Sequence, residues 1–205
     1  NKNIGIDLGI KEFATMSDCT KVANLKFTKE YEKRLKREQR KLSIRCRLAK
    51  SNNKKLFESK NYQKQKKKVA KIYNKIRNKR KDFINKISTE IINIHDIICM
   101  EDLNIKGMLK NHKLARSISD VSWSEFERQL EYKANWYGRI IVKVPKFYPS
   151  SKTCSSCGNV KKELPLSERT YHCECCGLEI DRDYNASINI LRKGLKILKE
   201  QGKLG

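Results

Sequence analysis

The chain has 205 residues, 38% of them hydrophobic, so it is long enough for one sizeable core and a small appendage. Its 47 Lys and Arg outnumber 23 Asp and Glu, and the net charge of +24 predicts a polyanionic partner, nucleic acid rather than a membrane surface. The chain has no apolar run of the roughly 18 residues that a membrane span needs and no signal-peptide core, which predicts an intracellular, cytoplasmic protein.

Residues 1–28 have the pattern of strand, turn and strand, and we place the turn at residues 17–20. The first strand, "NIGIDLGI", carries Asp7 in an otherwise apolar setting. A buried carboxylate costs several kcal/mol unless a cation or hydrogen bonds compensate it. Asp7 is therefore either a satisfied core group or part of a site.

Residues 29–92 are predicted to form a basic helical insertion. Between residues 29 and 86 the chain has 24 Lys and Arg and five Asp and Glu, so +19 of its net charge lies there. This segment lacks Pro and Gly and has apolar residues at helical spacing, which predicts two long helices broken near residues 51–55. Charge of one sign favours binding to a phosphate backbone, although lysines that only keep a helical hairpin soluble are an alternative.

The next apolar run, Ile97 to Met100, predicts a buried strand that ends at the adjacent acids Glu101 and Asp102. A polar connection over residues 104–122 follows. An amphipathic helix is then expected from Trp123 to Tyr137, closed by Gly138, with a β-branched strand after it. Strands that alternate with helices in this way indicate an α/β fold.

Five of the eight cysteines lie between Cys154 and Cys176, and paired spacing indicates metal binding rather than disulfides. Cys154-x2-Cys157 and Cys173-x2-Cys176 form two knuckles, each followed by a glycine, which is typical of a structural four-thiolate zinc site. Cys175 is expected to be a spectator, and His172 is a weaker rival ligand. The ribbon also offers Lys161, Lys162 and Arg169 to nucleic acid.

A third acidic point follows the cysteines. "DRDYNASINIL" predicts a helix with an inward stripe of Ile188, Leu191, Leu195 and Leu198, and it begins with Asp181 and Asp183. Asp181 is either a helix N-cap or a site residue, and Asp102 could be a surface acid. Together with Asp7 and Glu101, an acid at this helix start is what a two-metal phosphodiesterase needs.

The motifs "GIDLGIKEFATMSD", "ICMEDLNIKGM", "SSKTCSSCG" and "CECCGLEIDRDYNASINIL", in this order, resemble the RuvC-like nuclease half of TnpB (OrfB), an insertion-sequence protein related to type V CRISPR effectors. The resemblance extends from Asn3 to about Leu195. It implies a ribonuclease H-like fold with the zinc ribbon inserted before the last helix. It also implies catalysis by Asp7, Glu101 and Asp183, which would hold Mg²⁺ or Mn²⁺, and the choice of Asp183 over Asp181 comes from the resemblance alone.

The resemblance further implies an RNA-guided DNA endonuclease of bacterial type that acts at the nucleoid, with DNA and guide RNA as partners. The expected parts are residues 1–28 and 93–150 of the RuvC-like domain, the insertion 29–92, the ribbon 151–179 and a last helix and tail over 180–205. Candidate nucleic-acid contacts are Lys33, Arg37, Arg40, Lys41, Lys64, Lys68, Lys71, Arg77, Lys152 and Arg182.

The chain departs from the family pattern at two places. It begins close to the first catalytic strand without the usual N-terminal region, which predicts an excised or truncated domain, and Cys19 replaces a common glycine in the first hairpin. A nucleic-acid-binding module without cleavage of its own is therefore the alternative function. "IGIDLG" also resembles a phosphate loop of actin-like ATPases, but the nine glycines include no comparable later loop.

Overall fold

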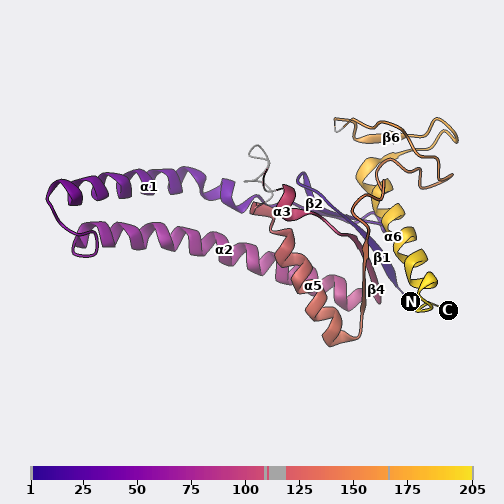
Figure 1. The fold of residues 1–205 in the computed structure, drawn as a ribbon, viewed down its shortest axis with the longest axis horizontal. Coiled ribbons are helices and arrows are strands. Elements are labelled where there is room, and N and C mark those ends of the chain that lie inside the picture. The colour runs from indigo at the N-terminus through magenta and orange to yellow at the C-terminus, as the bar shows by residue number, and fades with distance from the viewer. Residues whose placement is uncertain (1, 109, 111–118, 166, 205) are drawn as a thin grey trace. The chain divides into compact units, whose positions relative to one another are not determined.

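The computed structural model describes residues 2–108, 110, 119–165 and 167–204 (Figure 1). The chain divides into two compact units, one made of Asn1–Asn24 with Lys86–Gly205 and the other of Leu25–Asn85. Within the predicted polar connection, residues 109 and 111–118 lie outside the described part. Among the described helices, none has the length and apolar character required to cross a membrane.

The first unit contains the sheet elements, and the second contains most of the two long helices (Figure 1). The elements in chain order are β1 (Asn3–Leu8), β2 (Glu12–Met16), β3 (Lys21–Ala23), α1 (Phe27–Ser51), α2 (Lys60–Ile94), β4 (Ile97–Glu101), α3 (Ile105–Met108), α5 (Trp123–Tyr137), β5 (Ile140–Val144), β6 (Thr170–His172), β7 (Glu179–Asp181) and α6 (Arg182–Glu200).

Five strands form a mixed sheet in the order β3-β2-β1-β4-β5. Strand β2 is antiparallel to both β1 and β3, whereas β4 runs parallel to both β1 and β5. Strands that run parallel need a crossover connection. Helices α1 and α2 lie in the connection from β3 to β4, and α5 lies in the connection from β4 to β5. The fold is therefore mixed α/β, as the sequence predicted.

Helix α6 covers one face of this sheet, and α5 lies on the other side (Figure 1). Because strand side chains alternate between faces, Ile97 and Cys99 of β4 join the cluster that contains Ile190 and Leu198 of α6. On the other face, the ring of Phe13 meets that of Phe126 of α5 edge to face, with centroids 5.0 Å apart. Burial on both faces explains why these strands read as nearly continuous apolar runs.

The prediction of two strands over residues 1–28 is wrong, because there are three. A tight turn over residues 9–11 separates β1 from β2, and the N–H of Gly9 donates to the carbonyl of Phe13. The predicted turn at residues 17–20 joins β2 to β3 instead. Cys19 has a φ of 70° there, a left-handed conformation that glycine adopts without steric cost.

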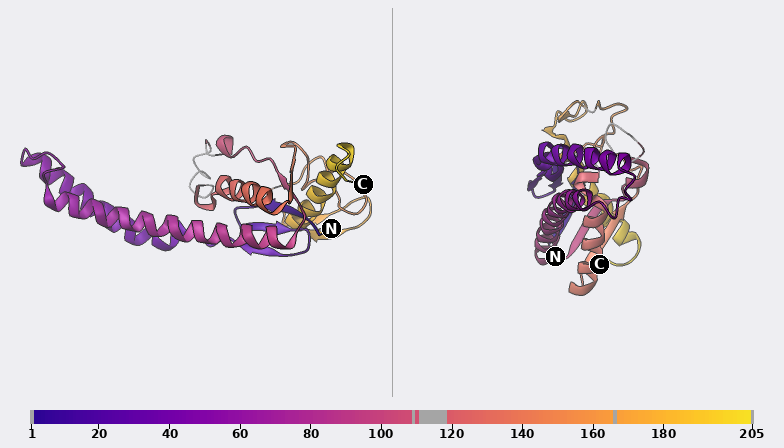
Figure 2. Two further views of the ribbon diagram at one scale, coloured as in Figure 1. Left: turned by 90° about the horizontal axis from the view of Figure 1, so that it is seen from below. Right: turned by 90° about the vertical axis from the view of Figure 1, so that its left-hand side faces the viewer.

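The second unit is an antiparallel helical hairpin of α1 and the first part of α2, which run alongside each other in Figure 1 and overlap in the left view of Figure 2. The two helices share a small apolar seam formed by Leu35, Val69, Ile72 and Ile76. At the seam, the buried amide of Gln65 donates to the backbone oxygen and the carboxylate of Glu38 at 3.0 and 2.8 Å. The break between the helices spans residues 52–59, slightly longer than predicted.

Strands β6 and β7 form a separate two-stranded antiparallel sheet, which Figure 1 shows beside the start of α6. Its small core contains Cys154, Cys173, Leu164 and the fully buried Tyr171. With so little apolar surface to bury, this ribbon needs another source of stability.

Candidate functional site

Strands β1 and β4 place Asp7 and Glu101 next to each other. In their parallel register Ile6 is paired with Met100, so Asp7 and Glu101 occupy the next position along each of the two adjacent strands. Glu101 is the last residue of β4, and its register partner on β5 is Val144. Two residues that are 94 positions apart in the sequence therefore become neighbours through strand pairing.

Helix α6 approaches these strands closely enough to bring a third carboxylate near. A Cβ atom at Gly5 would lie 2.2 Å from the backbone oxygen of Ser187, and one at Gly194 would lie 2.3 Å from Cys99 Sγ. Gly5 and Cys99 thus face α6, and by strand alternation so do Asp7 and Glu101 two residues further on. Asp183 lies in the first turn of this helix.

The three acids lie close enough for their charges to affect one another. Burial, followed by the charges of Glu101 and Asp183, raises the pKa of Asp7 well above its ordinary value. Burial also raises the pKa of Glu101, although the hydroxyl of Ser150, which donates to Glu101 Oε1, opposes this effect. Such carboxylates gain most from a nearby cation, because it would offset both burial and mutual repulsion.

Asp181 plays a different part from Asp183, two residues away. Its side chain caps α6 by accepting hydrogen bonds from the backbone N–H groups of Asp183 and Tyr184, both at 3.0 Å. It also forms an ion pair with Lys21 Nζ at 2.7 Å. Burial tends to raise its pKa, but the contacts with Lys21 and the N–H groups prevail and lower it. Asp181 is thus occupied as a helix cap.

The four knuckle cysteines form a compact thiol cluster. Among the described residues, Cys154, Cys157, Cys173 and Cys176 are the one group of at least three His, Cys, Asp or Glu whose ligand atoms all lie within 4.8 Å. The three carboxylates do not gather to that distance. The Sγ atoms of Cys154 and Cys176 are 3.6 Å apart, and so are those of Cys157 and Cys173. This distance is close to the ~3.8 Å between two sulfur atoms of a tetrahedral zinc site with Zn–S bonds of about 2.3 Å.

This thiol cluster has the chemistry that zinc requires. The backbone N–H of Cys176, against the effect of burial, lowers the pKa of Cys173 to about 6, so the thiolate form is favoured near neutral pH. Gly158 and Gly177 follow the knuckles with φ values of 78° and 71°. Cys175 and His172 are exposed and do not belong to the cluster. Four sulfur donors therefore fit a closed structural zinc site.

The candidate nucleic-acid contacts fall into two groups. Eight lie exposed on the second unit's helices: Lys33, Arg37, Arg40, Lys41, Lys64, Lys68, Lys71 and Arg77. Lys152 and Arg182 are half-buried in the first unit and donate to the backbone oxygens of Lys162 and Pro165, both at 2.9 Å. These two side chains thus support the ribbon as well as carrying charge.

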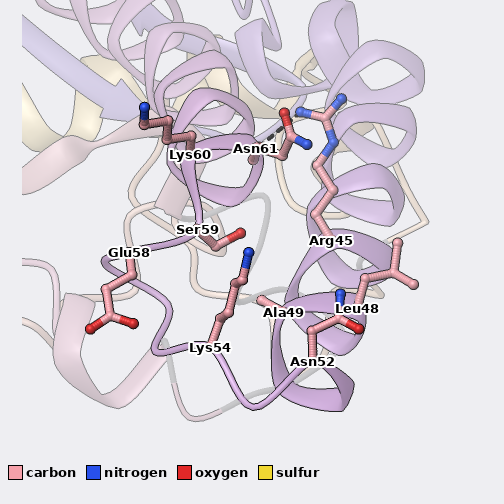
Figure 3. A pocket seen from close by; sticks show the side chains of 9 residues that line it. All are labelled: Arg45, Leu48, Ala49, Asn52, Lys54, Glu58, Ser59, Lys60 and Asn61. Atoms are coloured by element: carbon pink, nitrogen blue, oxygen red, sulfur yellow. Dashed lines mark hydrogen bonds between the residues drawn. The ribbon is translucent and has the colours of Figure 1, made fainter.

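A pocket of about 570 Å³ opens at the turn of the helical hairpin (Figure 3). Arg45 reaches across it and donates to the backbone oxygen of Asn61 at 2.9 Å. Its lining residues are Arg45, Leu48, Ala49, Asn52, Lys54, Glu58, Ser59, Lys60 and Asn61. None of the predicted catalytic, zinc or nucleic-acid residues is among them.

The polar residues beside the acidic site were not predicted from the sequence. Three members of the predicted inward stripe of α6 contribute to the core, since Leu198 is buried and Leu191 and Leu195 pack against its cluster. The buried face also includes Asn185, Ser187 and Asn189, which the stripe left out. Small and amide side chains face inward because the helix touches β1 at Gly5. The four-residue spacing of the two asparagines was the one available signal, since it places both on one helix face.

The fold and these sites define a mixed α/β protein with an acidic cluster, a four-cysteine ribbon and a strongly basic helical hairpin. The family model described as "Probable transposase" (OrfB, IS605 type) matches residues 1–112, and the model described as "Cas12f1-like, TNB domain" matches residues 123–190. The chain therefore belongs to the TnpB (OrfB) family, as its motifs predicted.

Individual relatives agree with this assignment. A Streptomyces pristinaespiralis protein named "Putative RNA-guided DNA endonuclease" is 42% identical over 94% of this chain and 45% of its own length. The Escherichia coli K12 protein "Putative RNA-guided DNA endonuclease InsQ" is 34% identical over 95% of this chain and 50% of its own. The chain thus spans about half the length of these relatives.

Two solved structures share the fold. A chain of the "Cas12f1-sgRNA-target DNA complex" is 22% identical with a TM-score of 0.58, and covers 92% of this chain and 49% of its own length. A chain of the "CRISPR-Cas12f Ternary Complex" is 23% identical with a TM-score of 0.62, and covers 92% of this chain and 38% of its own.

Proposed function

We propose that this chain is the metal-dependent DNA-cleaving part of a TnpB-type RNA-guided endonuclease. The observation that carries this proposal is the convergence of Asp7, Glu101 and Asp183 from two strands and a helix start, with the pKa of Asp7 raised by burial and by the charges of both neighbours. The sheet order β3-β2-β1-β4-β5, with α6 against its centre, supports a ribonuclease H-like, RuvC-type fold.

The three acids have the donor chemistry of a magnesium or manganese site. Carboxylate oxygens are hard ligands, which suit Mg²⁺ and Mn²⁺ better than zinc. Two such cations would supply an activated water and stabilise the leaving oxygen of a phosphodiester. Because the carboxylates lie further apart than the cysteine thiols, we expect cation binding to draw them together.

The protein's own residues have separate roles in this proposal. Asp7 lies on the central strand β1, close enough to Glu101 and Asp183 for their charges to act on it, and Glu101 accepts a hydrogen bond from the hydroxyl of Ser150. Asp183 is presented by the first turn of α6, while Asp181 holds that turn in shape as its cap. The four cysteines hold zinc, which stabilises the ribbon without taking part in the reaction.

The basic hairpin is proposed to bind the phosphate backbones of target DNA and guide RNA through its exposed lysines and arginines. We keep the expected division into RuvC-like parts 1–28 and 93–150, insertion 29–92, ribbon 151–179 and last helix and tail 180–205, while the compact helical unit itself spans Leu25–Asn85. For a protein with this activity in a bacterium, we propose a cytoplasmic location at the nucleoid.

A second candidate function is nucleic-acid binding without cleavage by this chain alone. It is favoured by the chain's coverage of only about half of each similar relative, together with the hairpin's concentration of charge. In that case the remaining part of a full-length protein would be needed to load substrate.

Cleavage of labelled single-stranded DNA in Mg²⁺ or Mn²⁺ tests the proposal, with the wild type beside Asp183→Asn and Asp181→Asn. Both variants lose one negative charge, but Asn still caps a helix. We expect Asp183→Asn, like Asp7→Ala and Glu101→Ala, to reduce cleavage at least ~100-fold, since even outer partners of metal ligands are worth 10–100-fold. Asp181→Asn should keep most of the activity.

The outcomes separate the two functions. Full-rate cutting by Asp7→Ala or Glu101→Ala would refute the assigned acids. Tight, salt-sensitive binding of DNA with no cutting by the wild type would identify the chain as the binding module.

A further inference from the structure

A short segment that follows β5 and leads into the first zinc knuckle lies against the acidic site. We define this segment, residues 150–155, as the strap. It begins at Ser150, which is only 6% exposed and whose hydroxyl donates to Glu101 Oε1. It includes the zinc-ligand candidate Cys154.

Two buried asparagines one helical turn apart on α6 hold the strap. Asn189 Nδ2 donates to the backbone oxygens of Ser150 and Thr153 at 2.9 and 2.6 Å. Asn185 Nδ2 donates to Thr153 O at 2.7 Å, and its Oδ1 accepts from the N–H of Ser155 at 2.9 Å. The strap backbone is therefore anchored to the helix that carries Asp183.

This anchoring limits how Ser150 can move. Its backbone oxygen is bound by Asn189, and its N–H donates to the carbonyl of Tyr148 at 2.8 Å. Because the backbone oxygen and the N–H of Ser150 are both hydrogen-bonded, its side chain can adopt only a few orientations. In one of them the hydroxyl reaches Glu101. A free glutamate side chain has rotamer entropy of up to about 2 kcal/mol, which would oppose any geometry that a ligand requires.

We propose that Ser150 is a positioning residue for Glu101, and that Asn185 and Asn189 set its place through the strap. The hydrogen bond uses one acceptor site of Oε1 and leaves the other acceptor sites of the carboxylate for a divalent cation. The inference rests on the proposed function, because it assigns a role toward the metal that Asp7, Glu101 and Asp183 are proposed to hold.

Mn²⁺ binding to the full zinc-loaded chain tests this role, with electron paramagnetic resonance as the readout. Ser150→Ala should weaken Mn²⁺ binding about 10–100-fold, as removal of outer-sphere partners of metal ligands does. Ser151→Ala, the adjacent half-buried serine outside this hydrogen-bonded network, should bind like the wild type.

Ser150→Thr and Ser150→Val form a matched pair that separates orientation from packing. The two side chains have the same shape, so any cost of the added methyl group is common to both, and only Thr keeps the hydroxyl. We expect Thr to restore Mn²⁺ affinity and Val to bind as weakly as Ser150→Ala, with thermal stability of the pair similar.

The measurement distinguishes two kinds of failure. If the wild type binds Mn²⁺ more tightly than Glu101→Gln but Ser150→Ala and Ser150→Val match the wild type, the positioning role is refuted and the acidic metal site stands. If the wild type binds no better than Glu101→Gln and Asp7→Asn, the proposed metal site fails and the positioning role fails with it.

Discussion

The helical hairpin of Leu25–Asn85 and the sheet unit differ in how many residues contribute to their chemistry and in how far apart those residues lie in the sequence. In the hairpin, charge is carried by many exposed side chains along two helices, around a thin seam of Leu35, Val69, Ile72 and Ile76. In the sheet unit, the acidic site depends on single residues brought together from β1, β4 and α6.

This difference predicts unequal tolerance to substitution. A binding surface made of many similar cations loses affinity gradually as charges are removed. A site made of three unique carboxylates, one supporting hydroxyl and a close helix contact fails when one part changes. We expect the effect of a substitution to be largest for the loss of a zinc ligand and smallest for the removal of a single buried charge.

Loss of a zinc ligand should have the largest effect. Structural zinc contributes roughly 10–16 kcal/mol to the folding of small zinc-finger peptides, so we expect Cys154→Ser to release zinc and unfold the ribbon. Cys175→Ser is the matched control, because Cys175 lies outside the thiol cluster. Bound zinc and the melting temperature measure the effect, and equal zinc loss in both variants would contradict the ligand assignment.

Gly5→Ala should disturb the sheet unit next most strongly. The new Cβ would lie 2.2 Å from the backbone oxygen of Ser187, and rigid backbone cannot give way as a side chain can. We expect destabilisation of about 3 kcal/mol or more, which lowers the melting temperature by about 6 °C or more.

Gly138→Ala is the control for Gly5→Ala. Its Cβ meets nothing within 4 Å, and only its φ of 63° opposes a side chain, at a cost of about 1–2 kcal/mol. Similar melting temperatures for the two variants would show that the contact between α6 and β1 is looser than described.

The hairpin should respond more gradually. We expect Lys68→Ala with Lys71→Ala to weaken binding of an RNA–DNA heteroduplex about tenfold and to reduce the salt slope by up to about two. Lys196→Ala with Lys199→Ala removes the same charge from exposed sites on α6. Fluorescence anisotropy across salt concentrations measures both, and an equal loss would mean that net charge, rather than the hairpin, determines binding.

Asp7→Asn should have a small stabilising effect that depends on pH. Because the folded state raises the pKa of Asp7, protonated Asp7 favours folding, and this contribution is lost as pH rises from about 4 through the raised value. In buffer without Mg²⁺ or Mn²⁺, Asp7→Asn should therefore be more stable than the wild type at pH 7, by about 1 kcal/mol or 2–4 °C.

The difference between Asp7→Asn and the wild type should shrink as the pH falls toward about 4, where Asp7 becomes protonated in the folded and the unfolded chain alike. Thermal melts across this range measure it, and comparison of the two proteins cancels the shared loss of zinc in acid. A wild type that is the more stable protein at pH 7 would contradict the buried, repelled state of Asp7.

Much of the molecule was predictable because its signals are local. The four knuckle cysteines lie in two short motifs, and the helices of the hairpin follow from apolar spacing without Pro or Gly. The third strand over residues 1–28 was missed, because the tight turn after Leu8 interrupts an apolar run by only three residues.

The sequence by itself determined the charge of the hairpin, the thiol cluster and the family, because each depends on residue types at short spacing. Only the tertiary structure decided that Asp7 and Glu101 share a register, that Asp181 caps α6, and that Ser150 bonds to Glu101. The physical reason is that strand pairing and helix packing join residues tens of positions apart, and no local pattern records which partners meet.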